Sequence, residues 1–315
     1  MSAGYFISSY VIVTNCTSRK RIGAETVRFG KQTLGVNLRE TAQAWRRQLR
    51  SSAGKTLVSQ MYVGRSISEA KWVAARLHAP LHVVSAGLGL VCTDDKVPSY
   101  DVTISGADSR LSKALTKFNA QPSAWWRLVS GNNGLHCMAS RYPRTGILVA
   151  LPATYLDMVV DDLASFSPAQ RDRLRIFTSQ PGRNVLPPSL AENVMPYDDR
   201  LESVSGYSGT RADFPQRAMR HFVNCLEAQS LSLSKAHEAV TRSLGRYSKP
   251  KKVERMRADD QQITRLIREQ WETADGRSTA LLRYLRDEAL VSCEQSRFAQ
   301  LFRLVRDEVD RNVSR

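Results

Sequence analysis

The residues best suited to chemistry are an aromatic ring and a carboxylate that stand side by side at Tyr100 and Asp101. Cleavage of a glycosidic bond passes through an oxocarbenium-like state, which a carboxylate stabilises or helps water to capture. The neighbouring ring can stack on a base turned out of a nucleic-acid helix. A loop aspartate also commonly caps a backbone turn. We therefore predict Asp101 as a catalytic carboxylate, with turn capping as the alternative, and Tyr100 as part of a base pocket.

A second group of candidates, Ser85, Gly87 and Gly89, follows the apolar run at residues 81–84. Such an abrupt stop predicts the carboxyl end of a buried strand, and open parallel sheets bind their ligands at such ends. Glycine lets the backbone approach a ligand closely or adopt a positive φ. We predict that these three residues line the base pocket together with Tyr100.

A third group follows the first apolar run of the chain. Asn15 and Ser18 are small hydrogen-bonding residues, and the cations Arg19, Lys20 and Arg21 come directly after them. Backbone amides and positive charge together suit a phosphate or a carboxylate. We predict Asn15 as a second catalytic residue that positions a base edge or a water, Ser18 as a pocket residue and the three cations as DNA contacts. The alternative is a solvated basic turn.

Strands and helices that alternate along the chain must position these loops. Four β-rich runs recur, and amphipathic helical patterns separate them. This alternation predicts an α/β fold, with a small four-stranded parallel sheet flanked by helices. The predicted strands are residues 10–14, 81–85, 146–150 and 174–178, and the main helices between them are residues 38–50, 66–77 and 153–166.

The composition of the chain changes after residue 180. Residues 181–209 are rich in Pro, Gly and Ser, which is typical of a linker or a long surface loop. We predict an α/β domain at residues 1–180, a linker at 181–209 and a basic α-helical DNA-binding region at 210–315. Helices at 278–287 and 293–311 are compatible with a helix-turn-helix DNA reader, but a structural helical hairpin has the same outline.

A net charge of +16 indicates a polyanionic partner, and we predict double-stranded DNA. Residues 1–60 carry a net charge of +8, residues 61–208 carry +2 and residues 209–315 carry +6. Basic ends around a nearly neutral middle favour a nucleic-acid track over a compact core, with an ordinary basic surface as the alternative. Besides residues 19–21, the predicted DNA contacts are Arg46, Arg47, Arg211, Arg217, Arg220 and Arg297.

Cysteine, histidine and hydropathy patterns narrow the classes of function. The five cysteines are scattered without a C-x-x-C pair, and the five histidines show no metal-ligand spacing. We therefore expect neither a disulfide framework nor a metal site, and we predict a reducing cytoplasm as the compartment. No apolar run approaches the roughly 20 residues that span a bilayer, so we expect no membrane partner.

Three stretches of the sequence together resemble a known bacterial group. They are Asn-Cys-Thr-Ser-Arg-Lys at 15–20, Met-Tyr-Val-Gly-Arg-Ser at 61–66, and Ser-Ala-Gly-Leu-Gly-Leu at 85–90 with Pro-Ser-Tyr-Asp-Val-Thr at 98–103. The group is related to the YaaA-like peroxide-stress proteins and, more distantly, to the uracil-DNA glycosylase superfamily. Among its members, the chain is similar to the antiviral DNA glycosylases of bacteria, which excise glucosylated hydroxymethylcytosine from phage DNA and leave abasic sites.

The resemblance covers residues 8–110 and implies a parallel four-stranded core with a DNA-facing pocket at the strand ends. It also implies that no metal or organic cofactor takes part. The chain departs from the uracil-glycosylase pattern, because it lacks the water-activating Asp beside Pro-Tyr and the late His-Pro-Ser loop. The positions that carry the resemblance are Asn15, Ser18, Arg19, Ser85, Gly87, Gly89, Tyr100 and Asp101.

Three functions follow as hypotheses from these residues and this resemblance. The first is a monofunctional DNA glycosylase in which Asp101 stabilises the sugar cation or orients water. Lys20 is the one rival, as an amine nucleophile. The second is a non-enzymatic DNA-binding protein in regulation or stress response. The third is a hydrolase or transferase of free nucleosides, which leaves the charge of +16 unexplained.

Overall fold

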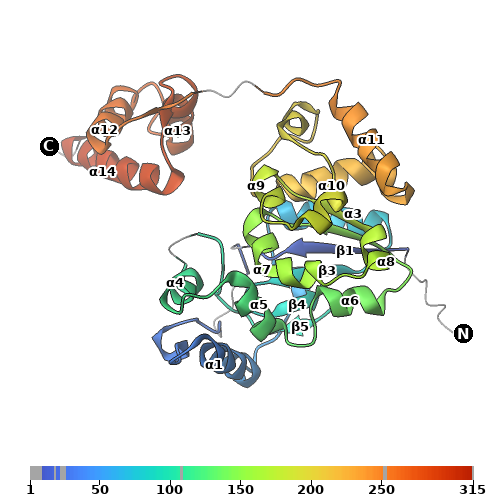
Figure 1. Ribbon diagram of the computed structural model, residues 1–315. Helices are drawn as coiled ribbons and strands as arrows, with labels where there is room; N and C mark the ends of the chain where they lie inside the picture. The colour runs from blue at the N-terminus through green and yellow to red at the C-terminus, as the bar shows by residue number, and fades with distance from the viewer. Residues whose placement is uncertain (1–8, 18, 22–25, 107–108, 251–253, 314–315) are drawn as a thin grey trace, which may run out of the picture. The chain divides into compact units, whose positions relative to one another are not determined.

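The computed structural model describes residues 9–17, 19–21, 26–106, 109–250 and 254–313. The chain divides into two compact units, Met1–Pro250 and Lys251–Arg315, which are coloured blue to orange and orange to red in Figure 1. No described helix is long and apolar enough to cross a membrane.

The first unit is built on a five-stranded sheet with the strand order β4-β3-β1-β6-β7. Strand β1 pairs in parallel with β3 and with β6, and β6 pairs in parallel with β7. Strand β4 is antiparallel to β3. The bounds are β1 Tyr10–Asn15, β3 Leu81–Ser85, β4 Gly89–Cys92, β6 Gly146–Ala150 and β7 Leu174–Phe177.

The four predicted strands are confirmed, and they form the parallel part of the sheet. The fifth strand, β4, was missed. It follows β3 through a tight turn, and Ser85 pairs directly with Gly89 across that turn. Residues 85–89 are therefore a hairpin turn and not an open loop, because the chain turns back and pairs on the edge of the sheet.

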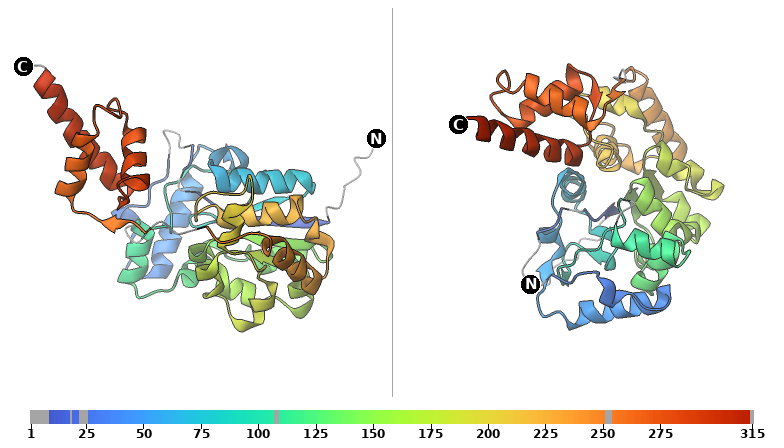
Figure 2. Two further views of the ribbon diagram at one scale, coloured as in Figure 1. Left: turned by 90° about the horizontal axis from the view of Figure 1, so that it is seen from above. Right: turned by 90° about the vertical axis from the view of Figure 1, so that its left-hand side faces the viewer.

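Helices cover both faces of the sheet, as Figures 1 and 2 show. Val11 and Val13 of β1 belong to one apolar core with α1, α5, α6 and α7. Ile12 belongs to the opposite core with α3 and α10, because side chains alternate between the faces of a strand. The helix bounds are α1 Leu38–Ser51, α2 Val58–Met61, α3 Arg65–Arg76, α4 Arg110–Lys117, α5 Pro122–Ser130, α6 Leu135–Arg141, α7 Ala153–Ala164, α8 Pro168–Asp172, α9 Gln180–Arg183, α10 Phe214–Asn224 and α11 Leu233–Leu244. A short pair of strands, β2 Thr56–Leu57 and β5 Lys96–Val97, completes the unit.

The predicted linker at 181–209 is part of this unit, so the domain boundary at 210 is wrong. The amide of Met195 donates to the carbonyl of Ile176 in β7 at 2.9 Å, and Leu190, Tyr197 and Leu201 are buried. Helix α10 packs against α3 and β6. The Pro- and Gly-rich composition therefore marks packed turns and short 3-10 segments, Pro188–Asn193 and Asp199–Ser203.

The second unit has its own core, to which Ile263, Ile267, Leu281, Leu285 and Val305 contribute. Its elements are β8 Met256–Arg257, α12 Asp260–Glu269, α13 Ser278–Asp287, β9 Val291–Ser292 and α14 Gln295–Val313. The unit holds 14 Lys and Arg against 12 Asp and Glu. The excess positive charge, +14 of +16, therefore lies in residues 1–250, and the prediction of a separate basic helical region at 210–315 is corrected.

Candidate nucleic-acid interface

The hydroxyl groups of Tyr62, Tyr100 and Ser85 form a buried chain of hydrogen bonds at the end of β3. The two phenol oxygens lie 2.7 Å apart, and the oxygen of Tyr100 lies 2.6 Å from that of Ser85. Burial raises the pKa of both tyrosines, so both stay protonated. Ser85 Oγ also accepts the amides of Gly87 and Leu88 at 3.2 and 3.0 Å. Ser85 therefore caps the hairpin turn, and Tyr100 fixes it.

The glycines of this turn make room for neighbouring side chains. A Cβ on Gly87 would lie 2.6 Å from the ring of Tyr100. Gly89 has a φ of 76°, and a Cβ there would lie 2.7 Å from the Cα of Ser130. We call Tyr62, Ser85, Gly87, Gly89 and Tyr100 the turn hub. The prediction that Ser85, Gly87, Gly89 and Tyr100 line an open base pocket is wrong in this structure, because each of them is buried.

Two tryptophans attach helices α1 and α5 to the hairpin turn at residues 85–89. The indole nitrogen of Trp45 in α1 donates to the carbonyl of Gly87 at 2.7 Å. That of Trp125 in α5 donates to the carbonyl of Ala86, also at 2.7 Å. Both indoles are fully buried, so each bond satisfies a donor and an acceptor that water does not reach. The hairpin turn therefore fixes where α1 and α5 stand against the sheet.

Asp101 caps a backbone turn, which is the alternative role that we considered from the sequence. Its Oδ1 accepts the amide of Phe29 at 2.8 Å, and its Oδ2 lies 3.4 Å from Nη1 of Arg110. The side chain stays 27% exposed. The carboxylate is thus oriented by two donors, and the side chain as a whole is partly exposed.

Asn15, the other predicted catalytic residue, is buried and faces the interior. Its Nδ2 donates to the carbonyl of Cys16 at 2.8 Å, and its Oδ1 accepts from Nε2 of Gln216 at 2.8 Å. Gln216, on α10, also bonds Thr14 Oγ1 at 3.0 Å and the carbonyl of Ala150 at 2.9 Å. Asn15 and Asp101 therefore have separate partners. No pattern in the sequence marks Gln216, which lies 201 residues from Asn15.

The basic loop after β1 is only partly exposed. Lys20 turns inward: its Nζ donates to the carbonyl of Val102 at 3.1 Å and lies 4.3 Å from the centroid of the Tyr100 ring. Burial lowers the pKa of Lys20, and Cys16 and Asp101 oppose that shift. The prediction of Lys20 as a phosphate contact is therefore corrected. Arg19 and Arg21 are exposed as a DNA contact requires, and Ser18 lies outside the described residues.

The cations predicted on α10 have intramolecular partners. Arg217 is fully buried, and its guanidinium lies 2.6 Å from Asp213 and 2.8 Å from Glu202. A buried guanidinium needs such partners, so Arg217 is not a DNA contact in this structure. Arg220 lies 2.7 Å from Glu69 and also covers the ring of Trp72 at 4.7 Å.

The other two cations predicted in the helical region differ from each other. In the second unit, Arg297 is paired with Asp260 at 2.6 Å, so its charge is already compensated. Arg211 is exposed. Of the predicted contacts in 210–315, Arg211 thus keeps the clearest access to a ligand.

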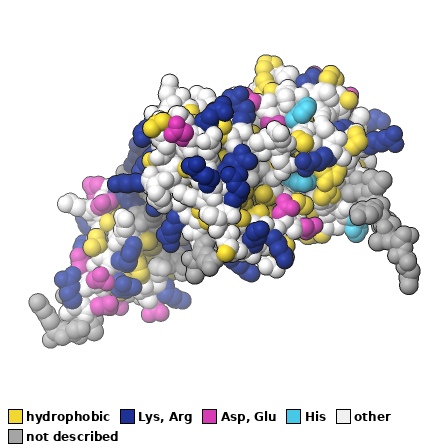
Figure 3. Space-filling model, turned by 90° about the horizontal axis from the view of Figure 1, so that it is seen from below, with side chains coloured by type: hydrophobic (Ala, Val, Ile, Leu, Met, Phe, Trp, Pro, Cys, Tyr) yellow, Lys and Arg dark blue, Asp and Glu magenta, His cyan; other side chains and the backbone are white. Residues whose placement is uncertain are grey.

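Exposed cations gather instead on α1, α4 and α5 with their flanking residues. We define the basic lobe as residues 28–55 and 110–130, which contain eleven Lys and Arg against one acidic residue, Glu40. The predicted contacts Arg46 and Arg47 lie here on α1, and both are exposed. Figure 3 views the molecule from this side and shows Lys and Arg side chains gathered over it. The same surface includes cations that we did not predict as DNA contacts from the sequence. On α4 and α5 these are Arg110, Lys113, Lys117 and Arg127.

Among the described residues, no group of three His, Cys, Asp or Glu side chains is placed to hold a metal ion. Comparison of the chain with family models, curated proteins and solved structures finds no match in any of the three.

Proposed function

We propose that this protein is a DNA glycosylase that excises a modified base and leaves an abasic site. Glucosylated hydroxymethylcytosine of phage DNA is the first candidate base, and the proposed role is antiviral defence in the bacterial cytoplasm. One observation carries the nucleic-acid part of the proposal. The basic lobe holds eleven cations against one acidic residue, and Trp45 and Trp125 attach it to the carboxyl end of β3.

The partner of such a surface is a polyanion. Phosphates on a DNA duplex bind Lys and Arg largely without regard to sequence, and this term supplies most non-specific affinity. Parallel sheets bind ligands at the carboxyl ends of their strands. A duplex held on the basic lobe would therefore lie beside Phe29, a residue of the lobe whose amide donates to Asp101.

The proposed reaction is hydrolysis of the bond between C1′ of the deoxyribose and the base nitrogen. As this bond breaks, the base leaves with the bonding electrons and C1′ gains cationic character. Water adds to C1′, and Asp101 accepts the proton that the water loses. The carboxylate of Asp101 suits this role because Phe29 and Arg110 orient it and part of it stays exposed.

A direct test treats phage DNA with glucosylated hydroxymethylcytosine, and plain DNA, with the purified protein and then with alkali. Alkali breaks the strand at each abasic site, so we expect breaks in the modified DNA. Asp101→Asn keeps an oxygen that can accept the amide of Phe29 and should lower the rate at least 100-fold, as loss of a general base does. Asp94→Asn, at an exposed turn, is the matched control. If no modified DNA breaks, the glycosylase proposal is wrong.

The same assay separates a water nucleophile from Lys20. If the amine of Lys20 attacked C1′, ring opening would give an iminium that borohydride reduces to a stable protein–DNA adduct. The proposal expects breaks with alkali but no adduct. An adduct in the native protein that Lys20→Gln abolishes would move the chemistry from Asp101 to Lys20.

A non-enzymatic DNA-binding protein is the second candidate function. It is favoured by the hydrogen bonds that already occupy the turn hub and Asn15. The hydroxyls of the hub bond one another, and Asn15 bonds the carbonyl of Cys16 and the side chain of Gln216. In that case Asp101→Asn should leave both DNA binding and the cellular phenotype unchanged. The two candidates thus give opposite results with one variant.

A further inference from the structure

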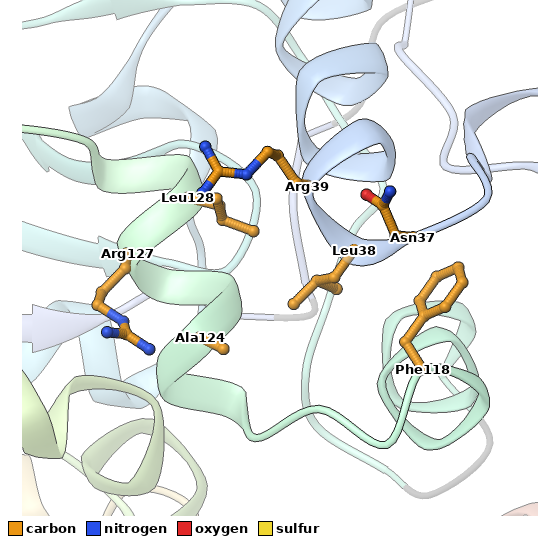
Figure 4. A pocket seen from close by; sticks show the side chains of 7 residues that line it. All are labelled: Asn37, Leu38, Arg39, Phe118, Ala124, Arg127 and Leu128. Carbon is orange, nitrogen blue, oxygen red and sulfur yellow. The ribbon is translucent and has the colours of Figure 1, made fainter.

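A hollow of about 670 Å³ lies in the basic lobe, between the start of α1, the end of α4 and α5. Figure 4 shows the side chains that line it. Its volume is within the range of roughly 300–1,000 Å³ that small-molecule sites occupy. The hollow is separate from the turn hub, since none of the hub residues lines it.

Two arginines line this hollow. Arg39 of α1 and Arg127 of α5 both line it, and both are exposed. Within the described part of the chain, neither guanidinium has a hydrogen-bond or ion-pair partner, whereas Arg217 and Arg220 are paired. The one acidic residue of the lobe, Glu40, accepts from Asn37 at 3.2 Å and from the amide of Val36 at 3.3 Å. The two guanidiniums are therefore available to an anion.

Apart from Asn37, the rest of the lining is apolar. Leu38, Phe118, Ala124 and Leu128 line the hollow, and all four are partly exposed. The ring of Phe118 stacks on no other aromatic ring among the described residues, although Lys117 Nζ lies 5.2 Å from its centroid. An aromatic ring and unpaired cations that line one hollow suit an unpaired nucleotide, because every base has a π-face and every nucleotide a phosphate.

We propose that this hollow binds one unpaired nucleotide of a nucleic-acid strand. The base lies against Phe118 and the apolar wall, and the flanking phosphates contact Arg39 and Arg127. A duplex fits the hollow less well, since its bases are stacked inside the helix. Its exposed phosphates gain nothing from contact with apolar side chains. The inference does not depend on glycosylase activity, because it concerns only binding.

The test measures binding of three fluorescent oligonucleotides by anisotropy: a dT 12-mer, a 12-mer of abasic units, and a hairpin duplex. The native protein should bind the dT 12-mer about tenfold more tightly than the abasic strand, because stacking of one base contributes roughly 1–3 kcal/mol. Phe118→Leu keeps an apolar side chain and loses the π-face. It should weaken binding of the dT 12-mer about tenfold and leave binding of the duplex unchanged.

Arg39→Gln and Arg127→Gln test the phosphate contacts without touching the apolar core. Each should reduce the slope of log K against log salt for the dT 12-mer by about 0.7, the value for one phosphate of a single strand. Arg144→Gln, an exposed arginine outside the basic lobe, is the matched control and should leave the slope unchanged. These two variants keep the proposal testable if Phe118→Leu fails to fold in a thermal melt.

Three results would overturn the proposal: equal affinity for the dT and abasic strands, native affinity of Phe118→Leu for dT, or an equal loss of duplex and dT binding in the arginine variants. The last result would make the hollow an ordinary duplex-phosphate contact. None of them bears on the alkali assay of base excision, so this inference and the glycosylase proposal can fail separately.

Discussion

Two interior groups, Tyr100 and Arg217, differ from two cations of the basic lobe, Arg39 and Arg127, in whether their charges and hydrogen bonds are already used. In the interior, Tyr100 bonds Tyr62 and Ser85, and Arg217 bonds Asp213 and Glu202. In the basic lobe, Arg39 and Arg127 have no partner among the described residues, and one acidic residue faces eleven cations. Satisfied buried groups hold a fold together, whereas unsatisfied exposed cations are free to bind. We therefore propose that the first pair serves structure and that the second pair serves binding.

The largest expected effect comes from breaking the buried ion pairs of Arg217. Arg217→Met leaves the buried carboxylate of Asp213 and the partly exposed carboxylate of Glu202 without their cation. Loss of one partner from a buried pair costs about 3–5 kcal/mol of unfolding free energy, and we expect about 4 kcal/mol in chemical denaturation. Arg39→Met, in the basic lobe, should change stability by less than about 0.5 kcal/mol. Equal losses of unfolding free energy in the two variants would contradict the distinction between the two regions.

The turn hub is tested next by Gly89→Ala. Gly89 has a φ of 76° and no space for a Cβ beside Ser130, whereas Gly206 has a φ of 80° and nothing within 4 Å of a built Cβ. Gly206→Ala thus measures backbone strain alone, about 1 kcal/mol. Gly89→Ala adds a steric clash, and we expect a total loss of about 3 kcal/mol. Similar melting temperatures for the two variants would show that the turn packs loosely against α5.

A smaller effect is expected from His221, which lies in the interior on α10. Burial lowers its pKa to about 4, and its Nδ1 lies 2.9 Å from the hydroxyl of Tyr197. The unfolded state takes up a proton below pH about 6.5, and the folded state does so only near pH 4. Stability should therefore fall as the pH drops through this window, by about 2 kcal/mol between pH 7 and pH 5. His221→Gln should flatten that dependence in urea titrations; an unchanged slope would assign it to other groups.

The sequence predicted the frame of the first unit because apolar runs mark buried strands. All four parallel strands and the helix Ser278–Asp287 are found where their patterns place them. Strand β4 was missed because its four residues follow a glycine-rich turn, and such a turn is typical of both a ligand loop and a hairpin. The boundary at 210 was wrong because Pro, Gly and Ser are equally common in linkers and in packed turns.

The candidate site was harder to predict, since it depends on contacts between distant residues. In the sequence, Tyr100 resembles a ring on which a base stacks. In the structure, its hydroxyl is bonded to Tyr62 and Ser85, which lie 38 and 15 residues away in the chain. In the sequence, Arg217 resembles a phosphate contact. In the structure, it is buried and forms an ion pair with Glu202. The positive charge of α1 could be predicted from the sequence. Only the fold shows that the cations of α4 and α5 lie on the same surface as those of α1.

The most direct test of the central claim compares two charge reversals of equal size in the first unit. Arg46→Glu/Arg47→Glu changes exposed residues of the basic lobe, and Arg242→Glu/Arg246→Glu changes exposed residues on and just after α11. Duplex DNA binding is measured by anisotropy over a range of salt concentrations. We predict that the first variant loses about 100-fold in affinity and about two units of salt slope, at roughly 0.9 per phosphate, while the second stays within a few fold of the native protein. Equal losses in both would contradict the assignment of DNA binding to the basic lobe.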